Sequence, residues 1–254
     1  MSNNFLPLNV PTFFKNEKKY LNDCIDSTWV STAGKYVNKF EEKISEFTNS
    51  KYAIACCSGT AALQVSLKVA GIQSDDEIIV PTVTFIAPIN AIKYNGAHPI
   101  FFDVDDYFNI DIKKLISFLN DETFFENGRT YNKRTKRIIR GILPVHVWGN
   151  ASNLEPVISI LKEREIKIIE DASESLGTTY RSGKLKGFHT GTVGELGCLS
   201  FNGNKIITTG GGGVILTNDI KFAEKSRYLT NQAKDDPIKF IHNEIGFNYR
   251  LTNL

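Results

Sequence analysis

One lysine in this sequence is placed where it could act as a nucleophile. Lys205 follows the apolar run 196–201 and precedes four consecutive glycines, 210–213, at the start of the next apolar run. A lysine on such a turn can form an imine with an aldehyde when burial or nearby positive charge lowers the pKa of its amine. Most lysines are solvated, and the glycines lack the Lys and Ser or Thr of a nucleotide P-loop. The local pattern leaves a catalytic and a surface Lys205 both open.

A phosphate-binding turn is the second candidate, at Ser58, Gly59 and Thr60. These residues lie between the apolar run 52–57 and an amphipathic segment that begins near Ala61. Glycine allows close approach to the backbone, hydroxyl groups donate hydrogen bonds, and the amides and dipole of a helix N-terminus favour phosphate. The alternative is an ordinary helix cap by Ser58 or Thr60.

Two carboxylates and an aromatic ring also follow apolar runs. Asp171 comes directly after the run 167–170, and such an anion can keep a pyridine nitrogen protonated. Asp171 could equally cap a turn, and Glu174, three residues on, could be a surface acid. Phe85 could stack on a flat ring or pack in the core. His146 has no partner at metal-ligand spacing, so we expect no metal site and a structural hydrogen bond from this histidine.

The elements that position these residues belong to an α/β fold. Short apolar runs alternate with amphipathic segments, as in strands joined by helical crossovers in a largely parallel sheet. The expected strands are 52–57, 77–80, 98–103, 138–144, 167–170, 196–201 and 213–217. The expected helices are 37–47, 60–70, 87–94, 112–119, 154–163 and 220–229. Ligands gather at the carboxyl ends of such strands, where the candidate residues lie. The basic segment 121–140 is expected to be a solvated loop, with contact to an anionic substrate as the alternative.

Composition limits the class of protein. With 254 residues and 41% hydrophobic residues, the chain can bury a core as one large domain or two modest ones. A net charge of +2 does not favour nucleic acid or an anionic membrane as the main partner. The four cysteines form no disulfide framework or CxxC pair, which fits a reducing cytoplasm. Residues 1–8 show no targeting pattern, and no apolar run reaches about 18 residues, so we expect a soluble, unprocessed protein.

Five motifs in this order resemble the DegT/StrS family of sugar-nucleotide aminotransferases: SGTAAL, PTVTFIAPINAI, IEDASESLG, LSFNGNKIITTGGGG and GFNYRLTNL. The resemblance covers essentially the whole chain. TWVSTAGKYVNKFEEKISEF and PVHVWGN look most like the members that aminate 4-keto-6-deoxy sugar nucleotides on routes to legionaminic acid and related surface glycans. The resemblance implies that residues 1–254 are the large domain of a fold-type-I transferase dependent on pyridoxal 5'-phosphate (PLP). Its mixed, mostly parallel sheet of seven strands would lie between helices.

The resemblance also implies roles for individual residues. Lys205 would bind PLP covalently and move a proton between the sugar carbon and the cofactor. Asp171 would pair with the pyridinium nitrogen, and Phe85 would stack on the ring. The cofactor phosphate would be bound by Ser58, Gly59, Thr60 and Ser200.

Two further positions concern the cofactor oxygen and the subunit partner. Glu174 stands where many members carry Gln, near the phenolic oxygen of PLP. Asn248 would reach the phosphate in the neighbouring subunit of a homodimer with shared active sites. Sugar dehydratases related to this family carry His where this chain has Lys205, so the lysine favours transamination.

The reaction expected from the resemblance transfers an amino group, with L-glutamate as donor, to C4 of a nucleotide-linked 4-keto-6-deoxy sugar. Family members continue well beyond GFNYR into a smaller domain, so we expect this chain to be a truncated product or fragment without that domain. A catalytically impaired binding or dimerising module and another PLP reaction, such as a lyase reaction, stay open. The nucleotide, the sugar, the amine stereochemistry and the donor are open as well.

Overall fold

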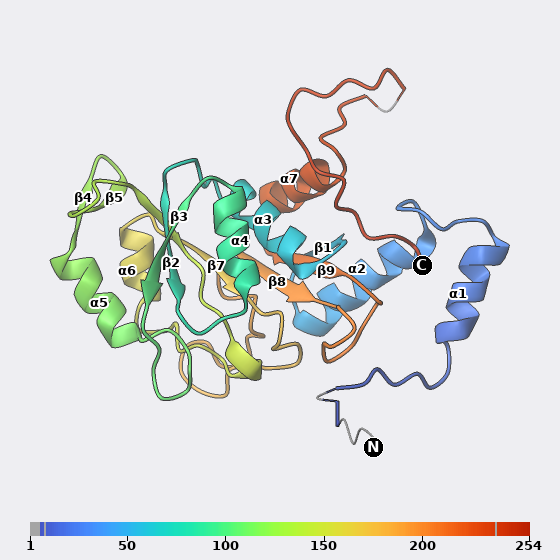
Figure 1. The fold of residues 1–254 in the computed structure, drawn as a ribbon, viewed down its shortest axis with the longest axis horizontal. Coiled ribbons are helices and arrows are strands. Elements are labelled where there is room, and N and C mark those ends of the chain that lie inside the picture. Colours follow the sequence, from blue (N-terminus) through green and yellow to red (C-terminus); the bar gives the residue numbers. More distant parts are fainter. Residues whose placement is uncertain (1–5, 8, 237) are drawn as a thin grey trace, which may run out of the picture.

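Seven strands form one sheet at the centre of the molecule (Figure 1). In chain order they are β1 (Tyr52–Cys56), β2 (Glu77–Pro81), β3 (His98–Phe102), β6 (Ile139–Ile142), β7 (Lys167–Asp171), β8 (Leu196–Ser200) and β9 (Gly213–Thr217). Their order in space is β1-β9-β8-β7-β6-β2-β3. Strand β9 runs antiparallel to both neighbours, and the other pairs are parallel. The predicted mixed, mostly parallel sheet is confirmed, and each predicted strand is found.

Helices cover both faces of the sheet. They are α2 (Lys35–Thr48), α3 (Gly59–Val69), α4 (Ile86–Tyr94), α5 (Ile112–Asp121), α6 (Ile158–Glu163) and α7 (Ile220–Thr230), whereas α1 (Glu17–Asp26) lies apart from the sheet. In strand β2, Ile78 and Val80 join the core formed with α3, α4 and α7, whereas Ile79 joins the core formed with α5 and α6. This alternation follows from the two-residue period of a strand, and it gives three layers.

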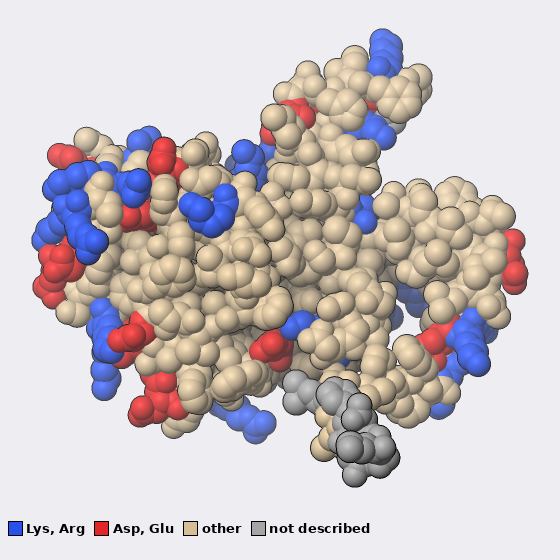
Figure 2. Space-filling model, in the orientation of Figure 1, with Lys and Arg blue, Asp and Glu red and all other residues tan. Residues whose placement is uncertain are grey.

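The basic segment 121–140 differs from the expectation of a loop. It contains the hairpin of β4 (Thr123–Glu126) and β5 (Arg129–Asn132) and the beginning of β6. The turn consists of Asn127 and Gly128, both with positive φ (50° and 72°), as a two-residue type I′ hairpin requires. The loop prediction was therefore wrong for these strands. The basic side chains still gather at this end of the molecule (Figure 2), mostly exposed.

Helix α1, which no sequence pattern predicted, lies beside the main body near the end of the chain (Figure 1). The structure, a computed structural model, describes residues 6, 7, 9–236 and 238–254. Most of segment 1–8, in which no targeting pattern was found, thus lies outside the described residues. No helix in the described ranges combines the length and the hydropathy that crossing a bilayer requires.

The final residues fold back on the first helices. Arg250 donates to Glu41 of α2 at 2.8 Å, and Arg227 of α7 donates to the other oxygen of the same carboxylate at 2.8 Å. The amide side chain of Asn253 accepts from the backbone N–H of Tyr36 at 2.9 Å. A buried carboxylate thus joins α2, α7 and the last segment of the chain.

Candidate active site

A cavity of about 520 Å³ opens where β7 and β8 end and α3 begins. Open α/β sheets commonly bind ligands at this edge. Eight of the nine predicted site residues line the cavity: Ser58, Gly59, Thr60, Phe85, Asp171, Glu174, Ser200 and Lys205. Segments far apart in the sequence are therefore brought to one place, as the motif order predicted.

The N-terminus of α3 forms one end of the cavity. The Ser58 hydroxyl accepts from the backbone N–H of Ala61 at 3.1 Å, so Ser58 caps the helix, as the alternative interpretation expected. The backbone of Gly59 lies so close to β8 that a Cβ here would meet the Cβ of Ser200 at 2.9 Å. Thr60 and Ser200 add hydroxyl groups at this end. First-turn amides and hydroxyls together form a site suited to a phosphate.

Asp171 and Phe85 both line the cavity but differ in exposure. Asp171 ends β7 and is buried, and its Oδ1 accepts from the Ser173 backbone N–H at 3.0 Å. Burial raises the pKa of Asp171, although this hydrogen bond and the charge of Lys205 act in the opposite direction. Phe85 precedes α4 and is 76% exposed, so it is not packed in the core. Its ring is available to a ligand.

Lys205 lies in the connection between β8 and β9, with a side chain that is only 18% exposed. Its Nζ is 3.5 Å from Oε1 of Glu174. The other oxygen, Oε2, accepts from the backbone N–H of Trp148 at 3.0 Å. Both carboxylate oxygens of Glu174 thus face hydrogen-bond donors. Trp148 was not predicted as a site residue, and no local pattern marks it.

Asn248 is the predicted site residue that the cavity does not include. Its side chain is exposed, and its backbone forms an isolated bridge with Asn231. The expected contact of Asn248 with a neighbouring subunit's cofactor stays a prediction.

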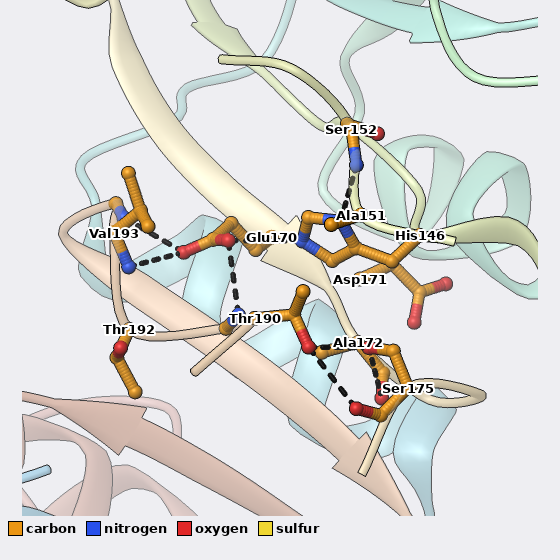
Figure 3. A network of polar contacts seen from close by, with 12 residues as sticks. His146, Ala151, Ser152, Glu170, Asp171, Ala172, Ser175, Thr190, Thr192 and Val193 are labelled. Carbon is orange, nitrogen blue, oxygen red and sulfur yellow. Dashed lines mark hydrogen bonds and ion pairs between the residues drawn. The ribbon is translucent and has the colours of Figure 1, made fainter. Parts of the chain in front are cut away.

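A buried carboxylate supports the cavity from behind β7. Figure 3 shows Glu170 between the ring of His146 and the loop 190–194. His146 Nε2 lies 2.9 Å from Glu170 Oε2, and its Nδ1 accepts from the backbone N–H of Ser152 at 3.0 Å. Because Nδ1 accepts, Nε2–H is the donor to Glu170. The structural hydrogen bond predicted for His146 is confirmed.

Glu170 accepts three further hydrogen bonds, all from backbone amides. Gly191 donates to Oε2 at 2.9 Å, and Val193 and Gly194 donate to Oε1 at 2.7 Å each. Burial alone would raise the pKa of Glu170, but the hydrogen bond from His146 and those from the amides outweigh it, so the pKa lies below its usual value. The loop that follows β7 is thereby fixed by an ionised carboxylate.

The chemistry of the cavity fits PLP. A phosphate can meet the α3 N-terminus, a flat ring can meet Phe85, and an anion and an amine are present in Asp171 and Lys205. The hydroxyl of Thr84 also lines the cavity, and it is buried without a hydrogen-bond partner among the described residues. Buried polar groups normally have a partner, so this hydroxyl is consistent with a polar ligand beside it.

Comparisons with known proteins agree with this geometry. The sequence model of the DegT/DnrJ/EryC1/StrS aminotransferase family matches residues 11–254. The chain is 37% identical to GDP-perosamine synthase of Escherichia coli O157:H7, over 98% of this chain and 63% of that protein. It is 31% identical to a UDP-N-acetyl-3-dehydro-alpha-D-glucosamine 3-aminotransferase of Acidithiobacillus ferrooxidans, over 84% of this chain and 52% of that protein.

Solved structures share the fold. Helicobacter pylori PseC, an aminotransferase involved in the biosynthesis of pseudoaminic acid, superposes with a TM-score of 0.83 at 26% identity. That match covers 97% of this chain and 62% of PseC, so the chain spans less than two thirds of the relatives it matches. Because the family model extends over nearly the whole sequence, this chain belongs to the DegT/DnrJ/EryC1/StrS aminotransferase family.

Proposed function

We propose that residues 1–254 form the PLP-binding large domain of an aminotransferase that acts on a nucleotide-linked keto sugar. One observation carries the proposal: the half-buried amine of Lys205 shares a cavity with the buried Asp171 and the open N-terminus of α3. Membership of an aminotransferase family and the names of the relatives support the same reaction.

PLP, when bound, withdraws electrons from the carbon that carries the amine and so allows the amino group to pass between an amino acid and a ketone. Lys205 Nζ would hold the cofactor and carry the proton to and from the reacting carbon. Asp171 would keep the ring nitrogen protonated, and that cation would offset the burial that raises the pKa of Asp171. Glu174, whose Oε1 lies 3.5 Å from Nζ, would hold the Lys205 amine in the cavity.

The phosphate would lie at the α3 N-terminus. Its oxygens would accept from the first-turn amides and from the hydroxyl groups of Thr60 and Ser200. Ser58 would contribute by capping the helix and fixing its first turn. Gly59 would contribute because, without a Cβ, it allows the first turn of α3 to lie close to Ser200 of β8.

For the substrates we propose L-glutamate as donor and C4 of a 4-keto-6-deoxy sugar as acceptor. The relatives' names include a perosamine synthase and a 3-aminotransferase, so the position aminated is the point to test. We also propose a cytoplasmic homodimer in which Asn248 reaches the partner's cofactor phosphate. A binding or dimerising module without turnover is the second candidate.

Absorption spectroscopy of the purified chain with PLP tests the proposal. A visible band that L-glutamate removes is expected, and borohydride reduction should fix the cofactor on the peptide that contains Lys205. Lys205→Ala should abolish the band and the attachment, whereas Lys184→Ala, at an exposed position outside the cavity lining, should retain both. Normal turnover by Lys205→Ala would contradict the proposed role. A band without any amination of a nucleotide sugar would favour the binding module.

A further inference from the structure

The cavity has an aromatic wall that the proposed chemistry does not use. Trp148, in a short turn over Val147–Gly149, lines the cavity and is 66% exposed. Phe108 packs edge-on against the indole, with ring centroids 5.1 Å apart at an angle of 65°. A large exposed aromatic side chain in the wall of a ligand cavity is a candidate ligand contact.

The backbone holds these two rings in an unusual conformation. Trp148 and Phe108 both have left-handed φ values, 51° and 64°, which bulky residues rarely adopt. The two loops are joined by Asn109, whose Oδ1 accepts from the hydroxyl of Ser152 at 3.1 Å. The carbonyl of Gly149 accepts from the Thr178 hydroxyl at 2.9 Å. The surrounding contacts therefore maintain a strained arrangement that presents the indole to the cavity.

The wall lies within reach of the reacting atoms. The backbone N–H of Trp148 donates to one oxygen of Glu174, and the other oxygen is 3.5 Å from Lys205 Nζ. The backbone nitrogen of Trp148 is therefore within about 9 Å of the Lys205 amine, given ordinary covalent geometry. A hexose ring whose keto carbon approaches Lys205 would lie in the cavity that Trp148 lines, whereas the nucleobase is separated from that carbon by the sugar and two phosphates.

We propose that Trp148, backed by Phe108, is a specificity-determining residue whose indole packs against the apolar C–H face of the hexose ring. This inference rests on the proposed function and deepens it. Ring stacking at the base of the nucleotide would use the same chemistry, but Trp148 lines the same cavity as Lys205, which favours the sugar. The side chain of Trp148 acts on the sugar, while its backbone N–H orients Glu174 whatever side chain is present.

Fluorescence gives a direct test because the chain has two tryptophans, Trp29 and Trp148. In Trp29→Phe the emission reports on Trp148 alone. This variant is titrated with GDP-perosamine, with UDP- and TDP-linked amino sugars, and with the three parent nucleotides. The sugar nucleotide that the chain uses should change the emission, and its parent nucleotide should change it much less. An equal response to the parent nucleotide would assign the indole to the nucleotide and overturn the inference.

Kinetics give the second test. Trp148→Ala should raise KM for the nucleotide sugar about tenfold, and should raise it more than KM for L-glutamate, whereas Trp148→Phe should keep most of the affinity. Phe125→Ala, which removes an exposed aromatic ring from the β4–β5 hairpin, is the matched control. Equal changes in both KM values would show a structural role and overturn the inference. If the unaltered chain binds PLP but aminates no nucleotide sugar, the proposed function fails and this inference fails with it.

Discussion

Replacing Glu170 with glutamine tests the buried network behind the cavity. The carboxylate accepts four hydrogen bonds, two at each oxygen, and all four donors are fixed by the backbone or by a buried ring. Glu170→Gln keeps the size of the side chain but changes one acceptor into an NH₂ donor. The substitution therefore changes hydrogen bonding without leaving a cavity.

The cost follows from where the NH₂ group can lie. In place of Oε1 it faces the N–H groups of Val193 and Gly194. In place of Oε2 the NH₂ group faces the N–H of Gly191 and the Nε2–H of His146. A shift of the His146 proton to Nδ1 would free Nε2 to accept, but it would place Nδ1–H against the backbone N–H of Ser152. Either placement leaves two buried donors without acceptors. At about 1–3 kcal/mol for each, the expected loss of unfolding free energy is about 4 kcal/mol.

Urea unfolding without PLP measures this loss. Glu46→Gln is the control, because Glu46 is exposed on α2 and pairs with the exposed Lys43, so its change should stay within about 0.5 kcal/mol. A loss below about 1 kcal/mol for Glu170→Gln would refute the reasoning, since it would mean that the four donors find other acceptors.

The pH dependence of the same difference supplies a second check. The folded-state pKa of Glu170 lies below the usual value of 4.5, so its ionised form stabilises the fold above that value. This stabilisation is lost as the pH falls through the folded-state pKa. The difference between wild type and Glu170→Gln should therefore be constant above about pH 5 and shrink below about pH 4.

Three other changes have definite expected outcomes. Gly59→Val should weaken PLP binding at least tenfold by equilibrium dialysis, because a Cβ at this position already meets Ser200 at 2.9 Å; unchanged affinity would place the phosphate elsewhere. Glu41→Gln should lower the unfolding free energy by about 3 kcal/mol in urea, since it leaves Arg250 buried beside a neutral group; a neutral effect would contradict the assigned pairing. Cys57 should be the first cysteine that iodoacetamide alkylates, as judged by peptide mass, because it is exposed in the cavity wall. PLP should slow this reaction. Partial burial raises the pKa of the Cys57 thiol, so its rate at pH 7 should lie below that of a free thiol.

The sheet could be predicted because each strand is a short apolar run bounded by polar residues. The β4–β5 hairpin was missed because basic residues dominate the segment, although Asn127 followed by Gly128 is a strong signal for a two-residue turn. Helix α1 was missed because it buries little: Cys24 is its buried residue, so no apolar stripe marks it. Patterns of hydrophobicity report burial, and elements with little burial escape them.

The cavity residues could be predicted only partly from local patterns. The local sequence predicts either a helix cap or a phosphate site at Ser58, Gly59 and Thr60. In the structure Ser58 caps the helix, and all three residues line the cavity. Trp148 could not be predicted, because its exposure and its left-handed backbone depend on contacts with loops distant in sequence. The pairing of His146 with Glu170 likewise depends on β6 and β7 being neighbours in the sheet.

The position of β1 at the edge of the sheet has a consequence for the order of folding. Its neighbour in the sheet is β9, so residues 52–56 must wait for residues 213–217. A growing chain emerges N-terminus first, and such long-range pairing forms slowly. The turn at Gly59 follows β1, Lys205 lies between β8 and β9, and β9 pairs with both β1 and β8. The site therefore forms at a late step of folding, and PLP would stabilise the completed sheet rather than guide the early chain.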